Sequence, residues 1–568
     1  MNKNKIPYGI SNFEQLRKEN YLYIDKTKYI ETLENDAPYQ FFIRPRRFGK
    51  SLFLSMLENY YDVNKRNSFD EIFKDLYISK NPTPKKNSYL ILRFDFSKLI
   101  TKEGKERFIK SFDDCVINAG KLFLKKYSSY FDDEKLPTAS TGAEMVMNFI
   151  LYKTEQVNKK IFVLIDEYDN FANNLISGGN KELYYELLSG EGYVKTFYKT
   201  IKTGTSKSIE RVFITGVSPI MLDDLTSGFN ITINFTLEKK YNEMMGFTSY
   251  EVRKLINSLD VLNKFHKETL FNDMKSYYNG YLFSEDSETR IFNPNMVLYF
   301  LNAVINNEKY PKNMLDLNIK TDYKKLEELA FNFEDDETIE KLLNKEEISI
   351  NLVEKFNLEY MYDKKENFIS LLYYLGMLTI KESLLGDVIL TIPNIAIETI
   401  YWEYFRDKLI SKSDLKIDNK IIKSGIMQMA LKGEMDLFVQ YFKTFMSNIS
   451  NRDLNRFDEK HIKIFLMSLF MNNIYIPNSE YEVENGFIDI LLTKNKAFED
   501  SIKYEWLIEL KYIKESERNK FEQVKKEGIN QIQRYSISEK LNKSFDMKHM
   551  KNVLIIVIGK KDIYVEVI

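Results

Sequence analysis

The chain has 568 residues, a formal net charge of −1, and ordinary shares of hydrophobic (44%) and charged (29%) residues. A chain of this length is expected to form about two to four domains with sizeable cores. Its balanced charge excludes a global electrostatic attraction to nucleic acid, so any such binding must use local patches. The single cysteine, Cys115, excludes an internal disulfide framework and a cysteine-based zinc site, and with only three histidines a histidine-rich metal site is not expected.

The chain shows no targeting or membrane-spanning pattern. Residues 1–6 are polar and lack the apolar stretch of a signal peptide. No apolar run approaches the length of a membrane span. The sequence therefore predicts a soluble, cytoplasmic protein with no membrane partner.

Residues 21–27 have the sequence Tyr-Leu-Tyr-Ile-Asp-Lys-Thr and precede a predicted helix. Asp25 or Thr27 is predicted to cap that helix, because short polar side chains accept hydrogen bonds from the free N–H groups of a first turn. A role in holding a nucleotide is the alternative.

A loop that ends in Gly-Lys-Ser lies between a predicted strand (residues 41–43) and a predicted helix that starts near Leu52. It is the second half of the phosphate-binding loop G-x-x-x-x-G-K-[ST], in the strand–loop–helix context that the motif requires. Gly49 lets the backbone turn its N–H groups onto phosphate oxygens, Lys50 reaches the β- and γ-phosphates, and the Ser51 hydroxyl ligates Mg²⁺. Arg44 replaces the first glycine of the pattern, and the alternative is a basic strand-to-helix turn. The predicted nucleotide-binding residues of this loop are Arg44, Pro45, Arg46, Arg47, Phe48, Gly49, Lys50 and Ser51.

Two carboxylates follow a later predicted strand, residues 161–165, which is apolar throughout. Such a run is typical of a strand buried on both faces of a parallel sheet, and ligands bind where those strands end. Asp166 is expected to hold Mg²⁺ and Glu167 to polarise the attacking water, as in a Walker B element; a strand that ends in acids by chance is the alternative. Thr215, at the end of the strand 211–217, is expected either to sense the γ-phosphate or simply to end its strand. The acid pair and the phosphate loop together predict a site that binds and hydrolyses ATP.

These motifs resemble those of the bacterial AAA-ATPase-like family that carries a C-terminal nuclease-like domain. The resemblance covers about residues 1–300 and beyond. In that family an arginine at the first loop position is usual, which implies that Arg44 need not mark an inactive site. The segments that carry the resemblance are 23–27 (Tyr-Ile-Asp-Lys-Thr), 43–51 (Ile-Arg-Pro-Arg-Arg-Phe-Gly-Lys-Ser), 164–169 (Leu-Ile-Asp-Glu-Tyr-Asp), 214–219 (Ile-Thr-Gly-Val-Ser-Pro), 278–281 (Tyr-Asn-Gly-Tyr) and 292–294 (Phe-Asn-Pro).

The middle of the chain carries less chemistry. Residues 247–278 and 295–307 are predicted helices, consistent with the helical lid that follows an AAA-type sheet, and residues 335–351 form a solvated helical surface or linker. Residues 368–380 predict a helix and then a strand, followed by a hairpin through Gly386. A helix with a β-hairpin indicates a winged helix, which the family resemblance also supports. Because this helix is apolar and not arginine-rich, we expect it to pack between domains and not to read DNA.

The C-terminal region carries a second set of polar residues. Residues 484–492 predict a turn that enters a strand with Asp489 at its start, and residues 504–512 predict the next strand. Side chains alternate along a strand, so Glu509 and Lys511 point to the same face. The spacing of 20 residues between Asp489 and Glu509 (509 − 489) allows a hairpin that brings the two carboxylates together. This D…E-x-K pattern resembles the PD-(D/E)XK nuclease superfamily.

In this chemistry Asp489 and Glu509 bind Mg²⁺ beside a scissile phosphate, and Lys511 orients the attacking water and stabilises the charge that develops. The resemblance further implies that Gln531, on a predicted helix over residues 521–536, is the auxiliary glutamine of many members, and that Glu459 contributes a metal ligand from a first helix. Lys463 stands where relatives often carry a histidine, which puts that second contact in doubt. The basic residues between 511 and 526 either contact phosphates or form a solvated face. A degenerate nuclease fold that binds without cleaving is the alternative.

The sequence therefore predicts a multidomain α/β protein. Its expected parts are an AAA-like P-loop ATPase domain (1–235), a helical lid (236–335), a winged-helix region with connecting helices (336–450) and a restriction-endonuclease-like α/β domain (451–568). The predicted function is Mg²⁺-dependent cleavage of nucleic acid, with DNA as the expected substrate, gated by ATP; family-level association alone suggests defence or mobile-element biology. Two alternatives stay open: a nucleotide-regulated switch or scaffold whose nuclease-like domain binds without cleaving, and a DNA-binding ATPase. A homo-oligomer is a further expectation, because AAA-type sites often take an arginine from a neighbouring copy.

Overall fold

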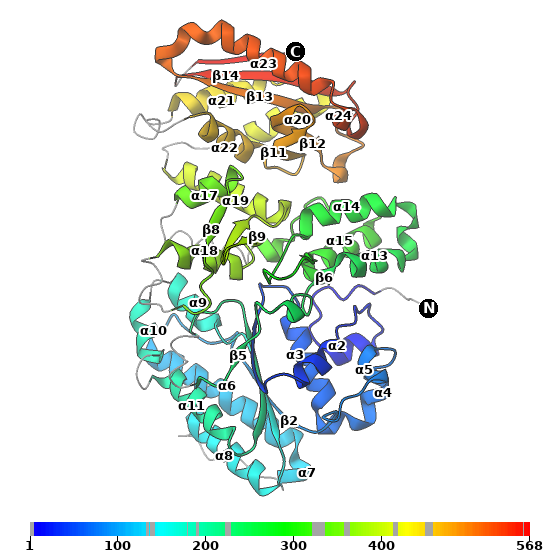
Figure 1. Cartoon of the computed structure of the whole chain (residues 1–568), viewed down its shortest axis with the longest axis vertical. Coiled ribbons are helices and arrows are strands. Elements are labelled where there is room, and N and C mark those ends of the chain that lie inside the picture. Colours follow the sequence, from blue (N-terminus) through cyan, green and yellow to red (C-terminus); the bar gives the residue numbers. More distant parts are fainter. Residues whose placement is uncertain are drawn as a thin grey trace. The chain divides into compact units, whose positions relative to one another are not determined.

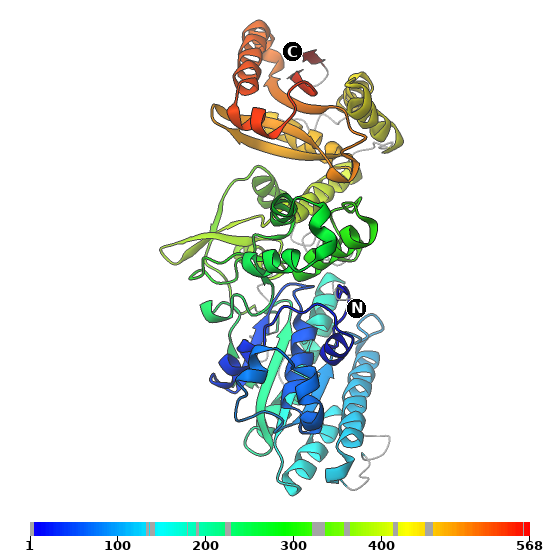
Figure 2. The same ribbon diagram turned by 90° about the vertical axis from the view of Figure 1, so that its right-hand side faces the viewer.

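The computed structural model describes all residues except 1–4, 132–135, 137–141, 179, 189–191, 222–228, 321–335, 357–363, 413–418, 449–457 and 560–561. The chain forms two compact units (Figures 1 and 2). The first unit comprises Met1–Asn306, Leu315–Asp336 and Glu347–Ile395, and the second comprises Asn307–Met314, Glu337–Glu346 and Ala396–Ile568. The domain boundaries predicted at residues 335 and 450 fall outside the described residues, so the four-part division stays a prediction.

A five-stranded parallel sheet organises the first unit, with the strand order β2-β3-β4-β1-β5. Its strands are β1 (Tyr39–Ile43), β2 (Leu90–Asp95), β3 (Ile161–Asp166), β4 (Ile209–Gly216) and β5 (Ile233–Asn234). The central strands are apolar and buried because helices cover both faces, as a parallel sheet requires (Figure 1). The strand β4 pairs with both β1 and β3, so the phosphate loop after β1 and the acid pair at the end of β3 meet at one edge of the sheet.

The helix α3 follows the phosphate loop and packs on one face of the sheet, where Phe53 and Leu57 share a core with Phe213 of β4. The helices α6, α8 and α11 lie on the other face (Figure 1). The helices around this sheet are α1 (Phe13–Lys18), α2 (Lys28–Glu34), α3 (Lys50–Tyr61), α4 (Phe69–Ile72), α5 (Tyr77–Lys80), α6 (Lys105–Lys126), α7 (Ser128–Phe131), α8 (Ala143–Gln156), α9 (Asn170–Ser177), α10 (Lys181–Leu188) and α11 (Tyr193–Gly204).

The prediction that Thr27 caps α2 is wrong, whereas Asp25 does accept a backbone N–H directly before the helix, that of Thr27 at 2.8 Å. Thr27 occupies the N-cap position, but its hydroxyl makes no capping hydrogen bond and instead donates to Asp25 Oδ1 at 2.6 Å. The other carboxylate oxygen of Asp25 accepts the backbone N–H of Tyr77 at 2.7 Å. The two residues thus connect the segment before α2 to the start of α5, where the Thr27 hydroxyl accepts the backbone N–H of Ile78 at 3.2 Å.

The rest of the first unit is a helical region followed by a helix and a small antiparallel sheet with the strand order β8-β10-β9. The hairpin was predicted through Gly386, and β9 and β10 do turn there. The identity of this part as a winged helix stays a prediction, and the burial of α18 from Asn367 to Tyr374 agrees with a packing role. The elements are β6 (Phe247–Thr248), α13 (Ser249–Asn257), α14 (Lys267–Tyr278), β7 (Ile291–Phe292), α15 (Pro294–Asn307), β8 (Ile348–Ile350), α18 (Lys365–Tyr374), β9 (Thr379–Leu384) and β10 (Asp387–Thr391).

The second unit contains a mixed five-stranded sheet in the order β11-β12-β13-β14-β15. Only β13 and β14 pair in parallel, and α23 connects them and packs against both. Its strands are β11 (Tyr475–Val483), β12 (Gly486–Lys494), β13 (Glu505–Ile513), β14 (Met550–Ile558) and β15 (Asp562–Val567), and its helices are α17 (Asp336–Leu343), α19 (Ile395–Lys412), α20 (Asn419–Lys432), α21 (Asp436–Asn448), α22 (Glu459–Phe470), α23 (Phe521–Ser536) and α24 (Glu539–Ser544). In the part of the chain that the structure describes, no helix is both long enough and apolar enough to cross a bilayer.

Candidate active sites

The loop between β1 and α3 is shaped to cradle an anion. Arg47 (φ 68°) and Gly49 (φ 93°) have left-handed backbone conformations, which turn the chain sharply into the N-terminus of α3. Lys50 is buried, and its Nζ donates to the carbonyl oxygens of Arg44 at 2.9 Å and Pro45 at 3.0 Å. Burial lowers the pKa of Lys50, and the nearby charge of Glu167 opposes that change. The lysine therefore holds the loop in its folded shape.

The side chain of Arg44 points into the protein and not into the loop. It is fully buried, and its guanidinium lies between the rings of Phe42 and Phe283, each 4.2 Å from Cζ. Burial lowers the pKa of Arg44 to about 9, which still leaves the guanidinium charged at neutral pH. Arg44 therefore anchors the base of the loop, and only its backbone faces the phosphate position. The guanidinium donates to the carbonyl oxygens of Ile43, Thr236 and Tyr241 at 2.9–3.0 Å.

The predicted acid pair lies beside Lys50 and Ser51. Asp166 is buried, its carboxylate accepts a hydrogen bond from the Ser51 hydroxyl, and its Oδ1 has no hydrogen-bond partner among the described residues. Burial raises the pKa of Asp166, and Ser51 and Lys50 oppose the rise. Glu167 follows with a left-handed backbone (φ 52°), a strained conformation of the kind found at functional sites. The hydroxyl and carboxylate oxygens fit a hard divalent cation, so Ser51 and Asp166 are suited to hold Mg²⁺.

Thr215 lies between these two parts, at the end of β4 and directly opposite Phe42 of β1. It is fully buried, and its Oγ1 has no hydrogen-bond partner in the described structure. Sequence reasoning missed Asp169, whose carboxylate accepts the backbone N–H groups of Val217 (3.1 Å) and Ser218 (2.7 Å). Asp169 thereby fixes the loop that follows Thr215. The only indication of this role in the sequence is that Asp169 is the third acid of the segment 164–169.

A cavity of about 510 Å³ opens over the phosphate loop. Residues 46–51 and Glu167 line this cavity, and so do apolar side chains that include Leu22, Met245, Leu255 and Leu298. A cavity of this size with both polar and apolar lining suits a nucleotide, which carries charged phosphates and an apolar base.

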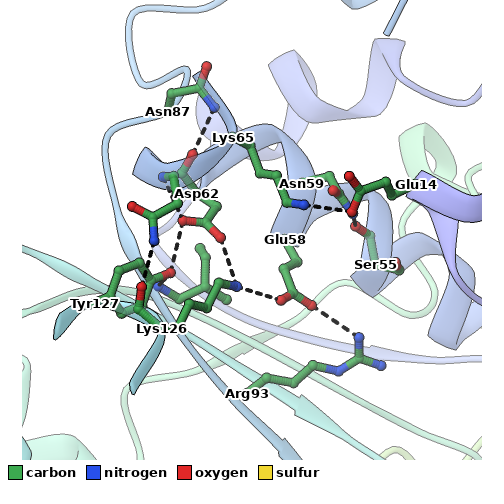
Figure 3. Close-up of polar contacts among 12 residues, drawn as sticks. Glu14, Ser55, Glu58, Asn59, Asp62, Lys65, Asn87, Arg93, Lys126 and Tyr127 are labelled. Atoms are coloured by element: carbon green, nitrogen blue, oxygen red, sulfur yellow. Dashed lines mark hydrogen bonds and ion pairs between the residues drawn. The ribbon is translucent and has the colours of Figure 1, made fainter. Parts of the chain in front are cut away.

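A network of charged residues connects α3 to β2 and α6 (Figure 3). Glu58 of α3 pairs with Arg93 of β2 at 3.2 Å and with Lys126 of α6 at 2.9 Å, and Lys126 also reaches Asp62 at 2.7 Å. The other nitrogen of Arg93 lies 3.6 Å from Asp166 Oδ2. The sequence alone did not single out Arg93. The sign that could have revealed its role is that it is the one arginine among the apolar residues of the strand Leu90–Asp95.

The second site lies on the mixed sheet of the second unit. Asp489 is on β12, Glu509 and Lys511 are on β13, and Glu459 begins α22. Asp489 Oδ2 accepts the backbone N–H of Leu510 at 2.8 Å, and Lys511 Nζ lies 2.7 Å from Glu509 Oε1. Glu459 reaches the same strand, where its Oε2 accepts the N–H of the residue after Lys511 at 3.0 Å. The structure therefore brings together the four residues that the sequence had placed in one site.

Burial raises the pKa of the acids at this site. Burial, and then the charge of Asp489, raise the pKa of Glu509, and burial also raises the pKa of Asp489 and of Glu459. Glu509 is only 1% exposed, and its Oε2 has no hydrogen-bond partner among the described residues. Carboxylate oxygens of this kind suit Mg²⁺. However, a protein donor holds each carboxylate, and no three acid, histidine or cysteine side chains of the described chain converge into a ready-made metal cage.

Three further residues, on α23 and β11, belong to the surroundings of this site. Gln531 is half-buried on α23, the helix that packs against β13 and β14. Tyr535, one turn further along α23, lies near Glu509 and Asp489: burial, and then their charges, raise the pKa of its hydroxyl. Sequence reasoning missed Glu480 of β11, which forms an ion pair with Lys463 beside Asp489.

Two family models match the regions of the chain that contain these residues. Residues 7–226 match the family described as predicted AAA-ATPase, and residues 457–567 match the PD-(D/E)XK nuclease superfamily. We call residues 7–226 the AAA-ATPase-like region and residues 457–567 the nuclease-superfamily region, after the family models that they match. The AAA-ATPase-like region contains the phosphate loop, the acid pair and Thr215, and the nuclease-superfamily region contains Asp489, Glu509, Lys511, Gln531 and Glu459.

Individual relatives are distant. An uncharacterised protein in the vnfD 5′ region of Azotobacter chroococcum is 25% identical over 300 residues, which are 52% of this chain and 51% of that protein, so the chain spans about half the length of this curated relative. Among solved structures, the Walker-type ATPase PABY2304 of Pyrococcus abyssi matches with a TM-score of 0.38 and 13% identity, over 68% of this chain and 97% of that one. The ORC2 protein of Aeropyrum pernix matches with a TM-score of 0.33 and 9% identity, over 69% and 98%. Similarity this low carries no argument about function.

Proposed function

We propose that this protein binds and hydrolyses ATP in its AAA-ATPase-like region and cleaves phosphodiester bonds of nucleic acid, DNA in particular, in its nuclease-superfamily region. The observation that carries the proposal is the convergence of Asp489, Glu509, Lys511 and Glu459 on one part of a sheet, in a chain that also holds the Gly-Lys-Ser end of a phosphate loop and an acid pair. These are the residue types that phosphoryl chemistry needs.

At the ATP site each side chain has a defined task. Lys50 exchanges its two loop carbonyls for phosphate oxygens, and Glu167, on its strained backbone, orients the attacking water. Thr215, opposite Phe42 of β1 and with an unpartnered Oγ1 in the described structure, would hydrogen-bond the γ-phosphate. Ser51 and Asp166 would hold Mg²⁺, which when bound neutralises charge on the phosphates.

At the second site Asp489, Glu509 and Glu459 would hold a divalent cation, which when bound stabilises the charge that develops on the scissile phosphate. The ammonium of Lys511, now 2.7 Å from Glu509, would orient the attacking water. Gln531, half-buried on α23, would bind the phosphate backbone.

A second candidate is a nucleotide-regulated switch whose nuclease-superfamily region binds nucleic acid without cleaving it. One observation favours it: protein donors already hold all three carboxylates, so cleavage requires these contacts to be released. Defence or mobile-element biology remains a prediction from the family alone.

The test is cleavage of single- and double-stranded DNA and RNA by the full chain, with Mg²⁺ or Mn²⁺ and with or without ATP. Asp489→Asn should abolish cleavage and leave ATP hydrolysis intact, whereas Lys50→Ala should abolish ATP hydrolysis and alter cleavage. Glu482→Gln, which changes an exposed carboxylate on β11, is the matched control and should behave as wild type. ATP hydrolysis without cleavage of any substrate would contradict the nuclease and support the switch.

A further inference from the structure

The N-terminal segment, residues 5–11, forms part of the wall of the cavity over the phosphate loop. Its residues 7 and 9–11 line that cavity. Residues 6–11 belong to no helix or strand, and Gly9 and Ser11 are exposed. The backbone of the segment is joined to the chain after α1 at Lys5, whose carbonyl oxygen accepts the N–H of Leu22 at 3.0 Å. An irregular and partly exposed segment of this kind opens more readily than a packed helix.

The helix α15 forms another part of the same wall and is firmly packed. Pro294, Asn295 and Leu298 of this helix line the cavity. On its other side, Val297 and Phe300 are fully buried. The core therefore fixes α15 in place, whereas the N-terminal segment can move without disturbing that core.

The side chain of Tyr8 joins these two parts of the wall. Its hydroxyl donates a hydrogen bond to Asp316 Oδ2 and accepts one from Asn318 Nδ2 at 3.2 Å. Asp316 is only 2% exposed, and the same Oδ2 accepts the side-chain amide of Asn295 at 3.0 Å. The ring of Tyr8 also lies against that of Tyr299 on α15, with centroids 6.2 Å apart. Because a hydrogen bond to a buried carboxylate is strong, Tyr8 holds the segment against α15.

Tyr8 itself is set back from the cavity. Among the described residues, its neighbours at positions 7 and 9 line the cavity and Tyr8 does not. Its hydroxyl therefore determines how firmly the segment is closed without contacting a molecule in the cavity. Segments that close over a bound ligand set the rates of entry and release in many enzymes.

We propose that the N-terminal segment is a movable cover of the nucleotide site, and that the Tyr8–Asp316 hydrogen bond limits how often this cover opens. The inference rests on the proposed function, because it describes how nucleotide enters and leaves the ATP site. Both steps take place while the cover is open, so loss of the bond accelerates both. Because Tyr8 does not contact the nucleotide, the ratio of the two rates, and with it Kd, stays nearly the same.

Stopped-flow fluorescence with mant-ADP, an ADP that carries a fluorescent group on its ribose, measures both rate constants on the full chain. Tyr8→Phe removes only the hydroxyl and should raise the association and dissociation rate constants by about tenfold each, the effect of losing one hydrogen bond to a carboxylate, with Kd within about twofold of wild type. Asn318→Ala removes the weaker, neutral donor to Tyr8 and should raise both by about twofold. Tyr77→Phe is the matched control, because it removes a hydroxyl that donates to the surface carboxylate of Glu31 at 2.8 Å, and it should leave both rate constants unchanged.

Two results would overturn the inference. One is a Tyr8→Phe protein that exchanges mant-ADP like wild type, even if its melting temperature is lower, because Tyr8 would then have only a structural role. The other is faster dissociation with unchanged association, which would mean that Tyr8 stabilises the bound nucleotide directly. Wild type that binds mant-ADP but does not hydrolyse ATP refutes the proposed hydrolysis and not the cover. Wild type that binds no nucleotide refutes the proposed ATP site and the cover with it.

Discussion

The guanidinium of Arg93 lies 3.6 Å from the carboxylate of Asp166, the acid that is suited to hold Mg²⁺ at the ATP site. The same guanidinium reaches Glu58 at 3.2 Å, so it connects the end of β3 to the helix that follows the phosphate loop. Burial raises the pKa of Asp166, and the charge of Arg93 is one of those that oppose the rise. Arg93 is thus a positioning residue for the acid and does not touch the nucleotide cavity.

Replacing Arg93 with glutamine should therefore slow ATP hydrolysis more than it weakens ATP binding. We expect kcat to fall by about tenfold, the effect of losing roughly 1.4 kcal/mol of transition-state stabilisation, with a smaller change in KM. Arg93→Lys should recover part of the rate, because it retains the charge. Steady-state kinetics measures kcat and KM of these variants. Arg66→Gln, which changes an exposed arginine of the same unit, is the control and should behave as wild type. A purely structural role for Arg93 would show as a lower melting temperature with an unchanged kcat.

Restoring glycine at the first position of the phosphate loop should damage the protein and not activate it. The Arg44 guanidinium satisfies three buried carbonyl oxygens and fills the space between Phe42 and Phe283. Arg44→Gly leaves those carbonyls unpaired and should reduce the free energy of unfolding by about 3 kcal/mol or more. Arg44→Lys keeps the charge but loses the planar set of guanidinium donors. Its free energy of unfolding should therefore lie between those of wild type and Arg44→Gly. Thermal unfolding of the three proteins tests the order, and a stable Arg44→Gly protein would disprove it.

The sequence predicted both sites because phosphate chemistry needs particular residue types at the ends of strands. Lys50, Asp166, Asp489 and Glu509 were found in this way, since spacing within a strand–loop–helix or along a strand is local information. The direction of Arg44, the reach of Arg93 to Asp166 and the position of Glu480 opposite Asp489 could not be predicted, because they depend on strand order and register between distant segments. The wrong cap at Thr27 has the same cause: Asp25 and Tyr77 meet only in the folded chain.

Gly280 should be irreplaceable because another backbone approaches it closely. Its φ is +104°, and a Cβ there would lie 2.0 Å from the carbonyl oxygen of Pro393. Gly386 has a similar φ of +92° with nothing within 4 Å, so Gly386→Ala measures the backbone strain alone, about 1 kcal/mol. Gly280→Ala adds the collision and should cost about 3 kcal/mol or more. Calorimetry of the two variants compares them directly, and equal melting temperatures would mean that the Pro393 contact is not maintained.

The charges around Glu58 should make the stability of the first unit depend on pH. Burial alone would raise the pKa of Glu58, but Lys126 at 2.9 Å and Arg93 at 3.2 Å lower it below its ordinary value of 4.5. A carboxyl with a lowered folded pKa stabilises the protein fully above its ordinary pKa, and this contribution is lost as pH falls through the folded pKa. Glu58→Gln should therefore reduce the free energy of unfolding by about 1–2 kcal/mol at pH 7. The gap to wild type should close as the pH falls below 4.5. Thermal unfolding across this pH range measures the gap, with Glu71→Gln, whose side chain is 62% exposed, as the control that should differ little from wild type throughout. A gap that stays constant with pH would show that the loss comes from packing and not from the charge of Glu58.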